Sequence, residues 1–353
     1  MTESVAIPSH VAEVDRDWLC AAIPDIADAR ILDVIHGTAT KIQAELDRRD
    51  GQGSFRVWVK SGMEPHSHTD GLEAVYAGEV IYYTRYADRY ETRTPQCHFA
   101  ASDAEGRSII VLDDLLEQGA TFVELPDAAS PETIAKGLEY IARYQAASWL
   151  DAGLADDPWL QSGGSHNAYD LPKWLYTEER WRQYSALPRF RHLAPQLRDR
   201  AMLERAHRAL LFDLFRREPW ALCHGDSHYG QAYALPNGEV RLLDWQAVQI
   251  AHWSHDMAYF MGSGLDVTDR RACETDLLRH YLGKLAEFGV AAPPDWDSAW
   301  RDYRMAILHG IGWTFCPPEM QPEENCAAIC ERFSAAVCDH DSVALIAANA
   351  GRA

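Results

Sequence analysis

Alternating apolar and polar residues mark a group of short extended segments in the first third of the chain. Residues 31–35, 39–46 and 55–60 have this character and are rich in β-branched and aromatic side chains. Turn-forming residues separate them, at Gly37-Thr38 and in the stretch RRDGQGS. Apolar positions between Leu72 and Tyr83 then follow helical spacing. Since HFAAS and RSIIVLDDL are again extended in character, the pattern predicts three strands, one helix and two strands.

Beyond residue 114 helical patterns dominate, with long segments expected at residues 131–149 and 197–217. Residues 222–244 form a β-rich interruption: an apolar approach (ALC), a polar loop (HGDSHYG), QAYAL, a Pro-Asn-Gly turn and VRLLD. Asn-Gly between two alternating segments is a strong hairpin signal. We therefore expect a hairpin flanked by the HGD sequence and by Asp244. Such a hairpin would bring the polar groups of both flanks together at one of its edges.

These elements predict an α+β fold with a small antiparallel sheet lobe followed by a larger, mostly helical lobe. The chain has 353 residues, of which 47% are hydrophobic and 24% charged, as in ordinary globular proteins. Its length fits one large or two closely packed units. Two cysteines, Cys326 and Cys330, recur at helical spacing with Phe333 and Val337, which favours a buried helix face over a metal site.

The charge balance limits the classes of partner. Lys and Arg total 33 against 53 Asp and Glu, a net charge of −20, and no basic stripe is present. Nucleic acid and anionic membrane surfaces are therefore not expected partners. The N-terminal stretch lacks the features of a signal peptide, and no segment reaches the roughly 20 apolar residues of a membrane span. We expect a cytoplasmic protein; its oligomeric state is left open.

Residues 224–244 contain the groups that phosphoryl transfer requires. That reaction needs a carboxylate to accept the hydroxyl proton and oxygen ligands for Mg²⁺. Asp226 is placed to act as the base, Gln231 offers an amide oxygen, and Asp244 offers a carboxylate after the hairpin. His224 is expected to brace the loop by hydrogen bonds, and Gly225 allows the tight turn before Asp226.

A cation for the nucleotide phosphates is expected further upstream. Lys60 ends the otherwise apolar strand FRVWVK, and Glu79 lies on the following predicted helix. A Lys–Glu pair of this kind positions the ammonium group beside phosphates. A lone lysine at a strand end is usually a surface residue. In combination with the HGD segment, the pair favours ATP as the phosphoryl donor.

The ordered motifs resemble one known family. Lys60, Glu79, IIVLDDLLEQGATF, CHGDSHYGQ, VRLLDWQ and HDMAYFM follow the order found in the aminoglycoside phosphotransferase and choline kinase superfamily, which has the protein-kinase-like fold. Within it, the chain resembles bacterial relatives of the ecdysteroid-kinase-like group. The resemblance runs from about residue 31 to the C-terminal helices. It implies an N-terminal lobe at residues 1–112, a hinge at 113–118 and a C-terminal lobe at 119–353.

Carried over by position, the resemblance implies a role for each motif residue. Asp226 becomes the catalytic base, and Gln231 and Asp244 become the Mg²⁺ ligands. The backbone of the hinge, at Asp113, Asp114 and Leu115, would hold adenine. Asp256 would anchor the catalytic region, and His228 would support the loop.

Two features depart from the family pattern. Asparagine is usual where this chain has Gln231, so the amide sits on a side chain one methylene longer. The segment HGTAT, expected to cover the phosphates, contains one glycine, Gly37, with hydroxyls from Thr38 and Thr40. Backbone N–H groups and hydroxyls can both meet phosphate oxygens, so this loop can still serve.

Several functions remain open. We expect the acceptor to be a small-molecule hydroxyl, with an apolar or ring-bearing alcohol favoured because the second lobe is rich in tryptophan. Among its tryptophans are Trp149, Trp174, Trp181, Trp253 and Trp313. The acidic group Glu319, Glu323 and Glu324 hints at an aminoglycoside instead. A catalytically weak nucleotide-binding regulator is a further alternative. So is a metal-dependent hydrolase built on His224, Asp226, His228 and Asp244.

Overall fold

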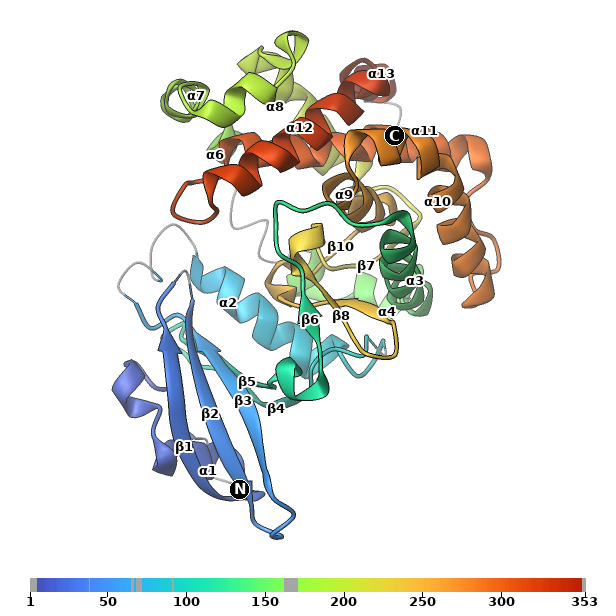
Figure 1. Cartoon of the computed structure of the whole chain (residues 1–353). Coiled ribbons are helices and arrows are strands. Elements are labelled where there is room, and N and C mark those ends of the chain that lie inside the picture. The colour runs from blue at the N-terminus through green and yellow to red at the C-terminus, as the bar shows by residue number, and fades with distance from the viewer. Residues whose placement is uncertain are drawn as a thin grey trace. The chain divides into compact units, whose positions relative to one another are not determined.

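The structure is a computed structural model that describes residues 5–37, 39–64, 67, 72–90, 92–161 and 171–350. The chain divides into two compact units. The first comprises Met1–Thr121 together with Leu243–Ala247, and the second comprises Phe122–Leu242 together with Val248–Ala353. Figure 1 shows the elements of both. The short segment Leu243–Ala247 thus belongs with a sheet formed by residues far earlier in the sequence.

The first unit contains an antiparallel sheet. Its described strands lie in the order β1-β2-β3-β5-β4 (Figure 1). Helix α1 (Arg16–Ala22) precedes the sheet and α2 (Leu72–Ile81) lies between β3 and β4 in sequence. The strand bounds are β1 (Ile26–Ile35), β2 (Thr40–Arg48), β3 (Ser54–Ser61), β4 (Cys97–Ser102) and β5 (Ser108–Asp113). The predicted order of three strands, one helix and two strands is confirmed, as is the α+β class.

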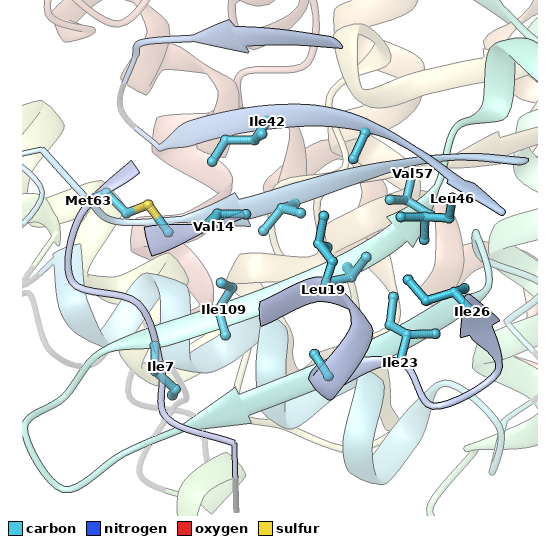
Figure 2. Packing of buried hydrophobic residues seen from close by; sticks show 14 residues of the cluster. Ile7, Val14, Leu19, Ile23, Ile26, Ile42, Leu46, Val57, Met63 and Ile109 are labelled. Carbon is cyan, nitrogen blue, oxygen red and sulfur yellow. The ribbon is translucent and has the colours of Figure 1, made fainter. Parts of the chain in front are cut away.

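Alternation along β2 and β3 produces the core of this unit. Ile42 pairs with Val59 and Ala44 with Val57, so these buried side chains share one face of the sheet. Leu19 of α1 packs into the same cluster (Figure 2). Each fully buried aliphatic side chain of this size contributes about 1.5–3 kcal/mol. Because successive side chains alternate, Lys60 must project from the opposite face.

Helix α2 ends in a π-helical turn, Tyr82–Tyr86. The ring of Tyr82 stacks on Trp245, with ring centroids 4.2 Å apart and planes inclined by 4°. Trp245 begins the 3-10 turn η10 (Trp245–Ala247). This stacking holds the segment that carries Asp244 against α2 within the first unit.

The second unit is mostly helical. Helix α3 (Pro131–Ala147) begins as predicted, with Ser130 Oγ accepting from Thr133 N and proline in the first turn. The helix expected from residue 197 begins instead at Arg200, because Asp199 caps it by accepting from Met202 N. The remaining described helices are α4 (Ala152–Ala155), α5 (Pro158–Gln161), α6 (Leu171–Leu175), α7 (Glu178–Ser185), α8 (Arg200–Ala209), α9 (Ser254–Gly264), α10 (Val267–Glu287), α11 (Trp296–Ala306), α12 (Glu323–Asp339) and α13 (Ser342–Asn349).

Short strands frame the HGD sequence. Strand β7 (Trp220–Cys223) pairs antiparallel with β10 (Gln249–His252), which the sequence pattern did not indicate. The predicted hairpin is confirmed: β8 (Ala232–Ala234) pairs antiparallel with β9 (Val240–Leu242). Gly238 in its turn has φ 85°, a value that favours glycine. A sheet in the order β6-β8-β9 is completed by β6 (Thr121–Phe122).

Neither a membrane-spanning helix nor a metal-binding cluster is present among the described residues. None of their helices is long and apolar enough to cross a lipid bilayer. No group of three or more His, Cys, Asp or Glu side chains within them is arranged to hold a metal ion. Cys326 and Cys330 are buried in α12, in agreement with the helix face predicted for them.

Candidate active site

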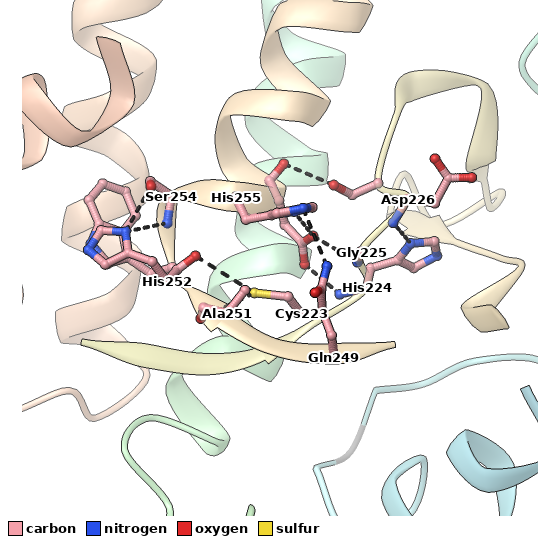
Figure 3. A network of polar contacts seen from close by, with 12 residues as sticks. Cys223, His224, Gly225, Asp226, Gln249, Ala251, His252, Ser254 and His255 are labelled. Carbon is pink, nitrogen blue, oxygen red and sulfur yellow. Dashed lines mark hydrogen bonds and ion pairs between the residues drawn. The ribbon is translucent and has the colours of Figure 1, made fainter. Parts of the chain in front are cut away.

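The HGD loop, residues 224–231, leaves strand β7 through a turn that requires glycine. Gly225 has φ 84°, in the left-handed region that favours glycine. The next residue, Asp226, donates its backbone N–H to Nδ1 of the buried His224, at 3.2 Å (Figure 3). Because Nδ1 accepts this bond, the ring proton of a neutral His224 resides on Nε2. His224 therefore braces the loop, which is the contact expected for it.

Asp256, on the first turn of α9, anchors the same loop. Its carboxylate accepts the backbone N–H groups of His224 at 2.6 Å and Gly225 at 3.1 Å. Tyr144 Oη donates to it at 2.6 Å. Burial alone would raise the pKa of Asp256, but hydrogen bonding and charge from His255, together with the other donors, lower that pKa to about 2. The buried carboxylate therefore stays ionised and keeps its hold on the loop.

Asp226 is held by side chains yet remains accessible. Gln231 Nε2 donates to Asp226 Oδ2 at 3.3 Å, and His228 Nε2 lies 3.8 Å from the same oxygen. The Asp226 side chain is 30% exposed, whereas that of His228 is 7% exposed. His228 also packs edge-on against Trp313, with ring centroids 4.9 Å apart. With its amide nitrogen turned to Asp226, Gln231 has its amide oxygen available as an acceptor or metal ligand.

A cavity of about 210 Å³ opens beside Asp226 within the second unit. Its walls are largely aromatic and apolar, with Trp174, Leu175, Trp313 and Met320 among them. Polar groups reach it from His207, His228, Tyr259, His309 and Gln321. Asp226 is the only carboxylate among the described residues that line it. The cavity can thus hold an uncharged molecule of modest size, with Asp226 at its edge.

The first unit contains a buried cluster of one cation and two carboxylates. Lys60 Nζ lies 2.7 Å from Glu79 Oε2 and 2.5 Å from Asp244 Oδ1. The exposed fractions of these side chains are 14% for Lys60, 4% for Glu79 and 22% for Asp244. Burial alone would lower the pKa of Lys60, but the two carboxylates raise it overall, so the ammonium stays charged.

Lys60 meets both of its partners because of local backbone geometry. The alternation in β3 turns Lys60 away from the core and toward α2, which carries Glu79. Asp244 has φ 68°, in the left-handed region that aspartate tolerates better than most residues. Burial raises the pKa of Glu79, an effect that the ammonium of Lys60 opposes.

The expected adenine segment follows β5. Asp114 is buried, caps the 3-10 turn η4 (Leu115–Gln118) through Leu116 N, and accepts from Gln43 Nε2 at 2.7 Å. Asp113 Oδ1 lies 2.7 Å from His98 Nε2. These carboxylates hold the strand end and the turn, and the side chain of Leu115 is buried.

The segment HGTAT is described only in part. Thr38 lies outside the described residues. Thr40 is buried, and its hydroxyl donates to Glu64 Oε1 at 3.3 Å. The expectation that Thr40 offers its hydroxyl to a phosphate is therefore not supported, since the group is turned into the protein.

The structure sorts the expected site residues into two groups. Lys60 contacts both Glu79 and Asp244 in the first unit. In the second unit Asp226 contacts Gln231, while His224 and Asp256 hold the loop. Trp313, one of the tryptophans on which the expected acceptor class was based, lines the cavity at Asp226 together with Tyr259, which sequence reasoning did not single out. The available signal was the position of Tyr259, three residues after Asp256 and thus on the same helix face.

Comparison with known proteins places several phosphotransferases beside this chain. No family model matches the sequence, and no curated protein matches it. Choline kinase LicA from Streptococcus pneumoniae is 14% identical, with 89% of this chain and 94% of that chain covered and a TM-score of 0.45. Wild-type aminoglycoside 2'-phosphotransferase-IIIa, solved with GDP, is 11% identical, with 91% and 96% covered and a TM-score of 0.49.

A third solved structure is macrolide 2'-phosphotransferase MphH from Brachybacterium faecium. It is 15% identical, with 85% of this chain and 91% of that chain covered and a TM-score of 0.41. The choline kinase and the aminoglycoside phosphotransferase bear the names of the superfamily that the motifs resemble.

Proposed function

We propose that this chain is an enzyme that transfers the γ-phosphoryl group of ATP, in the presence of Mg²⁺, to a hydroxyl group of a small molecule. The observation that carries the proposal is the buried Lys60, which pairs with Glu79 and with Asp244. A structural ion pair needs one carboxylate for one ammonium. The second carboxylate, that of Asp244, can serve a metal bound to a nucleotide, beside the ammonium that meets its phosphates.

The residues present suit a magnesium nucleotide. Mg²⁺ prefers oxygen ligands, and Asp244 offers a carboxylate while Gln231 offers its amide oxygen. Lys60 would hold the α- and β-phosphates, and the backbone at Asp113, Asp114 and Leu115 would hold adenine. When bound, Mg²⁺ would neutralise charge on the phosphates. Glu79 fixes the ammonium of Lys60, so that little reorganisation is needed on binding.

Asp226 is the proposed base. Its carboxylate lies at the cavity, where it can accept the proton of an acceptor hydroxyl and orient that hydroxyl for attack. The loop beneath it is rigid, because His224 bonds the backbone of Asp226 and Asp256 bonds the two preceding N–H groups. His228 supports the carboxylate from one side, with its ring against Trp313.

An apolar or ring-bearing alcohol is the proposed acceptor class. Trp174, Trp313 and Met320 line the cavity, and a polycationic aminoglycoside would meet only one carboxylate among the described lining residues. One member of the acidic group that hinted at such a substrate is otherwise engaged: Glu323 accepts from the backbone N and from Nε of the buried Arg189, each at 2.7 Å.

The remaining alternatives have less support. A metal-dependent hydrolase would use His224 as a ligand, yet its Nδ1 accepts the backbone N–H of Asp226. Asp244 is paired with Lys60. A catalytically weak nucleotide-binding regulator would have no need for the cavity beside Asp226.

The test is an acceptor screen with purified protein, ATP and Mg²⁺. Phosphorylation is monitored by the release of ADP and by mass spectrometry of the product. Hydroxylated ring compounds are expected to gain one phosphoryl group, while aminoglycosides are expected to give no release above the ATP-only rate. A chain that binds ATP but phosphorylates nothing in a broad panel would favour the regulatory alternative. Stoichiometric zinc in the purified protein would favour the hydrolase.

A further inference from the structure

We propose that two buried histidines, His207 and His309, select the acceptor by a second oxygen. The acceptor class is then an uncharged ring alcohol that also carries a carbonyl, ether or further hydroxyl oxygen, to which His309 Nε2 donates a hydrogen bond. The proposal rests on the proposed function, because it places the reacting hydroxyl at Asp226. His207 lies on α8, and His309 lies in the 3-10 segment η11 (Ile307–Phe315).

The two histidines form a hydrogen-bonded pair in the cavity wall. His207 Nε2 lies 3.3 Å from His309 Nδ1, and His207 Nδ1 lies 3.1 Å from Tyr176 Oη. Both histidines line the cavity beside Asp226. His207 is 0% exposed and His309 is 7% exposed. Since both ring nitrogens of His207 are engaged within the protein, His309 is the member of the pair that meets a ligand.

The phenol of Tyr176 sets the direction of these hydrogen bonds. Tyr176 is 1% exposed, and among the described residues its hydroxyl has one hydrogen-bond partner, His207 Nδ1. Burial raises the pKa of Tyr176, so the phenol keeps its proton. A buried hydroxyl proton requires an acceptor. His207 Nδ1 therefore accepts from Tyr176.

The positions of the histidine protons follow from this direction. Burial lowers the pKa of His207 to about 3, so its ring is neutral and carries a single proton, on Nε2. That proton is donated to His309 Nδ1, which must accept. A histidine whose Nδ1 accepts is itself neutral, and its own proton resides on Nε2. The chain thus runs from Tyr176 through His207 to His309 and ends in an N–H donor.

The chemistry of the cavity wall defines the group that this donor suits. An N–H pairs with the lone pairs of a carbonyl, ether or hydroxyl oxygen, whereas an ammonium group can only donate and is mismatched. No lysine or arginine is among the described residues that line the cavity, so an anionic group would lack a counter-charge there. An uncharged oxygen is the group that remains.

Neighbouring rings hold His309 in one orientation. Tyr259 packs edge-on against it, with ring centroids 4.9 Å apart and planes inclined by 80°. His255 lies on it at a centroid distance of 4.7 Å. Because the ring is fixed before a ligand binds, little side-chain entropy is lost when its N–H meets an oxygen. A second contact of this kind, together with Asp226, would also determine which hydroxyl of the acceptor reacts.

Two ring alcohols of matched shape test the donor. The probes are 4-hydroxycyclohexanone and 4-methylenecyclohexanol, in which a methylene group replaces the carbonyl oxygen, and Kd is measured by NMR titration without nucleotide. In the wild type, the Kd of the methylene probe divided by that of the ketone should be about tenfold larger than in His309→Phe, the effect of one hydrogen bond. Equal quotients in the two proteins, or no binding of the ketone to the wild type, would overturn the proposal.

Two further variants separate the N–H from the packing of the ring. His309→Gln keeps an N–H donor and should recover part of the selectivity that His309→Phe loses. His280→Phe is the matched control, because His280 lies on α10, outside the cavity lining, with a side chain that is 34% exposed. It should leave the quotient of Kd values within about twofold of the wild type. Equal losses in His309→Gln and His309→Phe, or a loss of the same size in His280→Phe, would overturn the role of the N–H.

A charged probe tests the exclusion of cations. The ring alcohol 4-aminocyclohexanol is protonated at neutral pH, and it should bind the wild type more weakly than 4-hydroxycyclohexanone in the same titration. Tighter binding of the amine would overturn the proposal.

The histidine protons are read directly from long-range ¹H–¹⁵N spectra of the labelled protein, with His207→Phe and His309→Phe used to assign the two rings. At neutral pH both should be neutral, with the proton on Nε2, and the ketone should shift the Nε2 signal of His309 but not that of His280. A charged His309, or one with its proton on Nδ1, would overturn the proposal. These measurements need no catalysis. If they agree but no acceptor is phosphorylated, the proposed function fails while the ligand preference of the histidine pair stands.

Discussion

Lys60 and Asp244 stand 184 positions apart in the sequence and form an ion pair inside the first unit. Glu79 binds the same ammonium at 2.7 Å. This relationship ties the sheet to the short segment after the hairpin and explains why a segment of the second half of the sequence belongs to the first unit. It also predicts how the cluster responds when its cation is removed.

Lys60→Met should lower the free energy of unfolding by about 3–5 kcal/mol, because the buried Glu79 and its neighbour Asp244 would lose the ammonium that pairs with both. Lys284→Met is the matched control, since Lys284 also has two acidic neighbours, Glu139 and Glu287, at the surface. That change should cost less than about 1 kcal/mol. Urea unfolding without nucleotide measures both. Equal stability of Lys60→Met and the wild type would mean that the cluster is not a charged one.

Gln231→Ala should raise the Mg²⁺ concentration for half-maximal activity by about tenfold or more, since one oxygen ligand of the proposed metal site is lost. Gln321→Ala removes a glutamine from the cavity wall and should leave the Mg²⁺ dependence unchanged. Titrating Mg²⁺ at fixed ATP distinguishes them. Were Gln231→Ala to keep the wild-type curve, the amide would have no part in binding the metal.

Gly137 of α3 permits the close approach of Phe260 on α9. A Cβ at Gly137 would lie 2.2 Å from Phe260 Cζ, so Gly137→Ala should destabilise the protein by about 1–3 kcal/mol. Gly283 of α10 has open space around it, and Gly283→Ala should stabilise by about 0.5–1 kcal/mol through the helix propensity of alanine. Opposite shifts in the urea midpoint are expected. A gain in stability from both changes would refute the packing argument.

Acid should weaken the fold through buried histidines. Burial lowers the pKa of His207 and of His252 from 6.5 to about 3 in the folded state. The unfolded chain therefore binds protons first, so this contribution to stability is complete above pH 6.5 and is lost as the pH falls toward 3. The slope is at most about 1.4 kcal/mol per pH unit for each histidine. His207→Gln should flatten the decline in the free energy of unfolding between pH 7 and pH 5. Replacement of the exposed His10 should leave that decline unchanged.

Local patterns predicted much of the fold. The alternation in residues 55–60 predicted strand β3 and a Lys60 side chain that points away from the core. The Asn237-Gly238 pair predicted the hairpin. Strand β10 was missed because its four residues include Gln249 and His252, whose polarity hides the pairing with β7. Such short strands are specified by their partners rather than by their own sequence.

The sequence predicted which residue types form the site, but not all of the contacts between those residues. The motif order placed Lys60 with Glu79, and that contact is present. The membership of Asp244 in the first unit depends on the left-handed backbone at that residue and on the stacking of Trp245 on Tyr82. Tyr259 was missed because a tyrosine in an apolar helix is usually part of the core, and only the position of Trp313, 54 residues later, reveals its hydrogen bond.

The central claim is that Asp226 accepts the proton of the acceptor hydroxyl, and the most direct measurement is the rate of phosphoryl transfer by Asp226→Asn to an acceptor found in the screen. We predict a loss in kcat of about 10²- to 10⁴-fold, with an unchanged rise in melting temperature on addition of ATP and Mg²⁺. Asp276→Asn, at a position whose side chain is 82% exposed, should transfer at the wild-type rate. A kcat for Asp226→Asn within about twofold of the wild type would contradict the account.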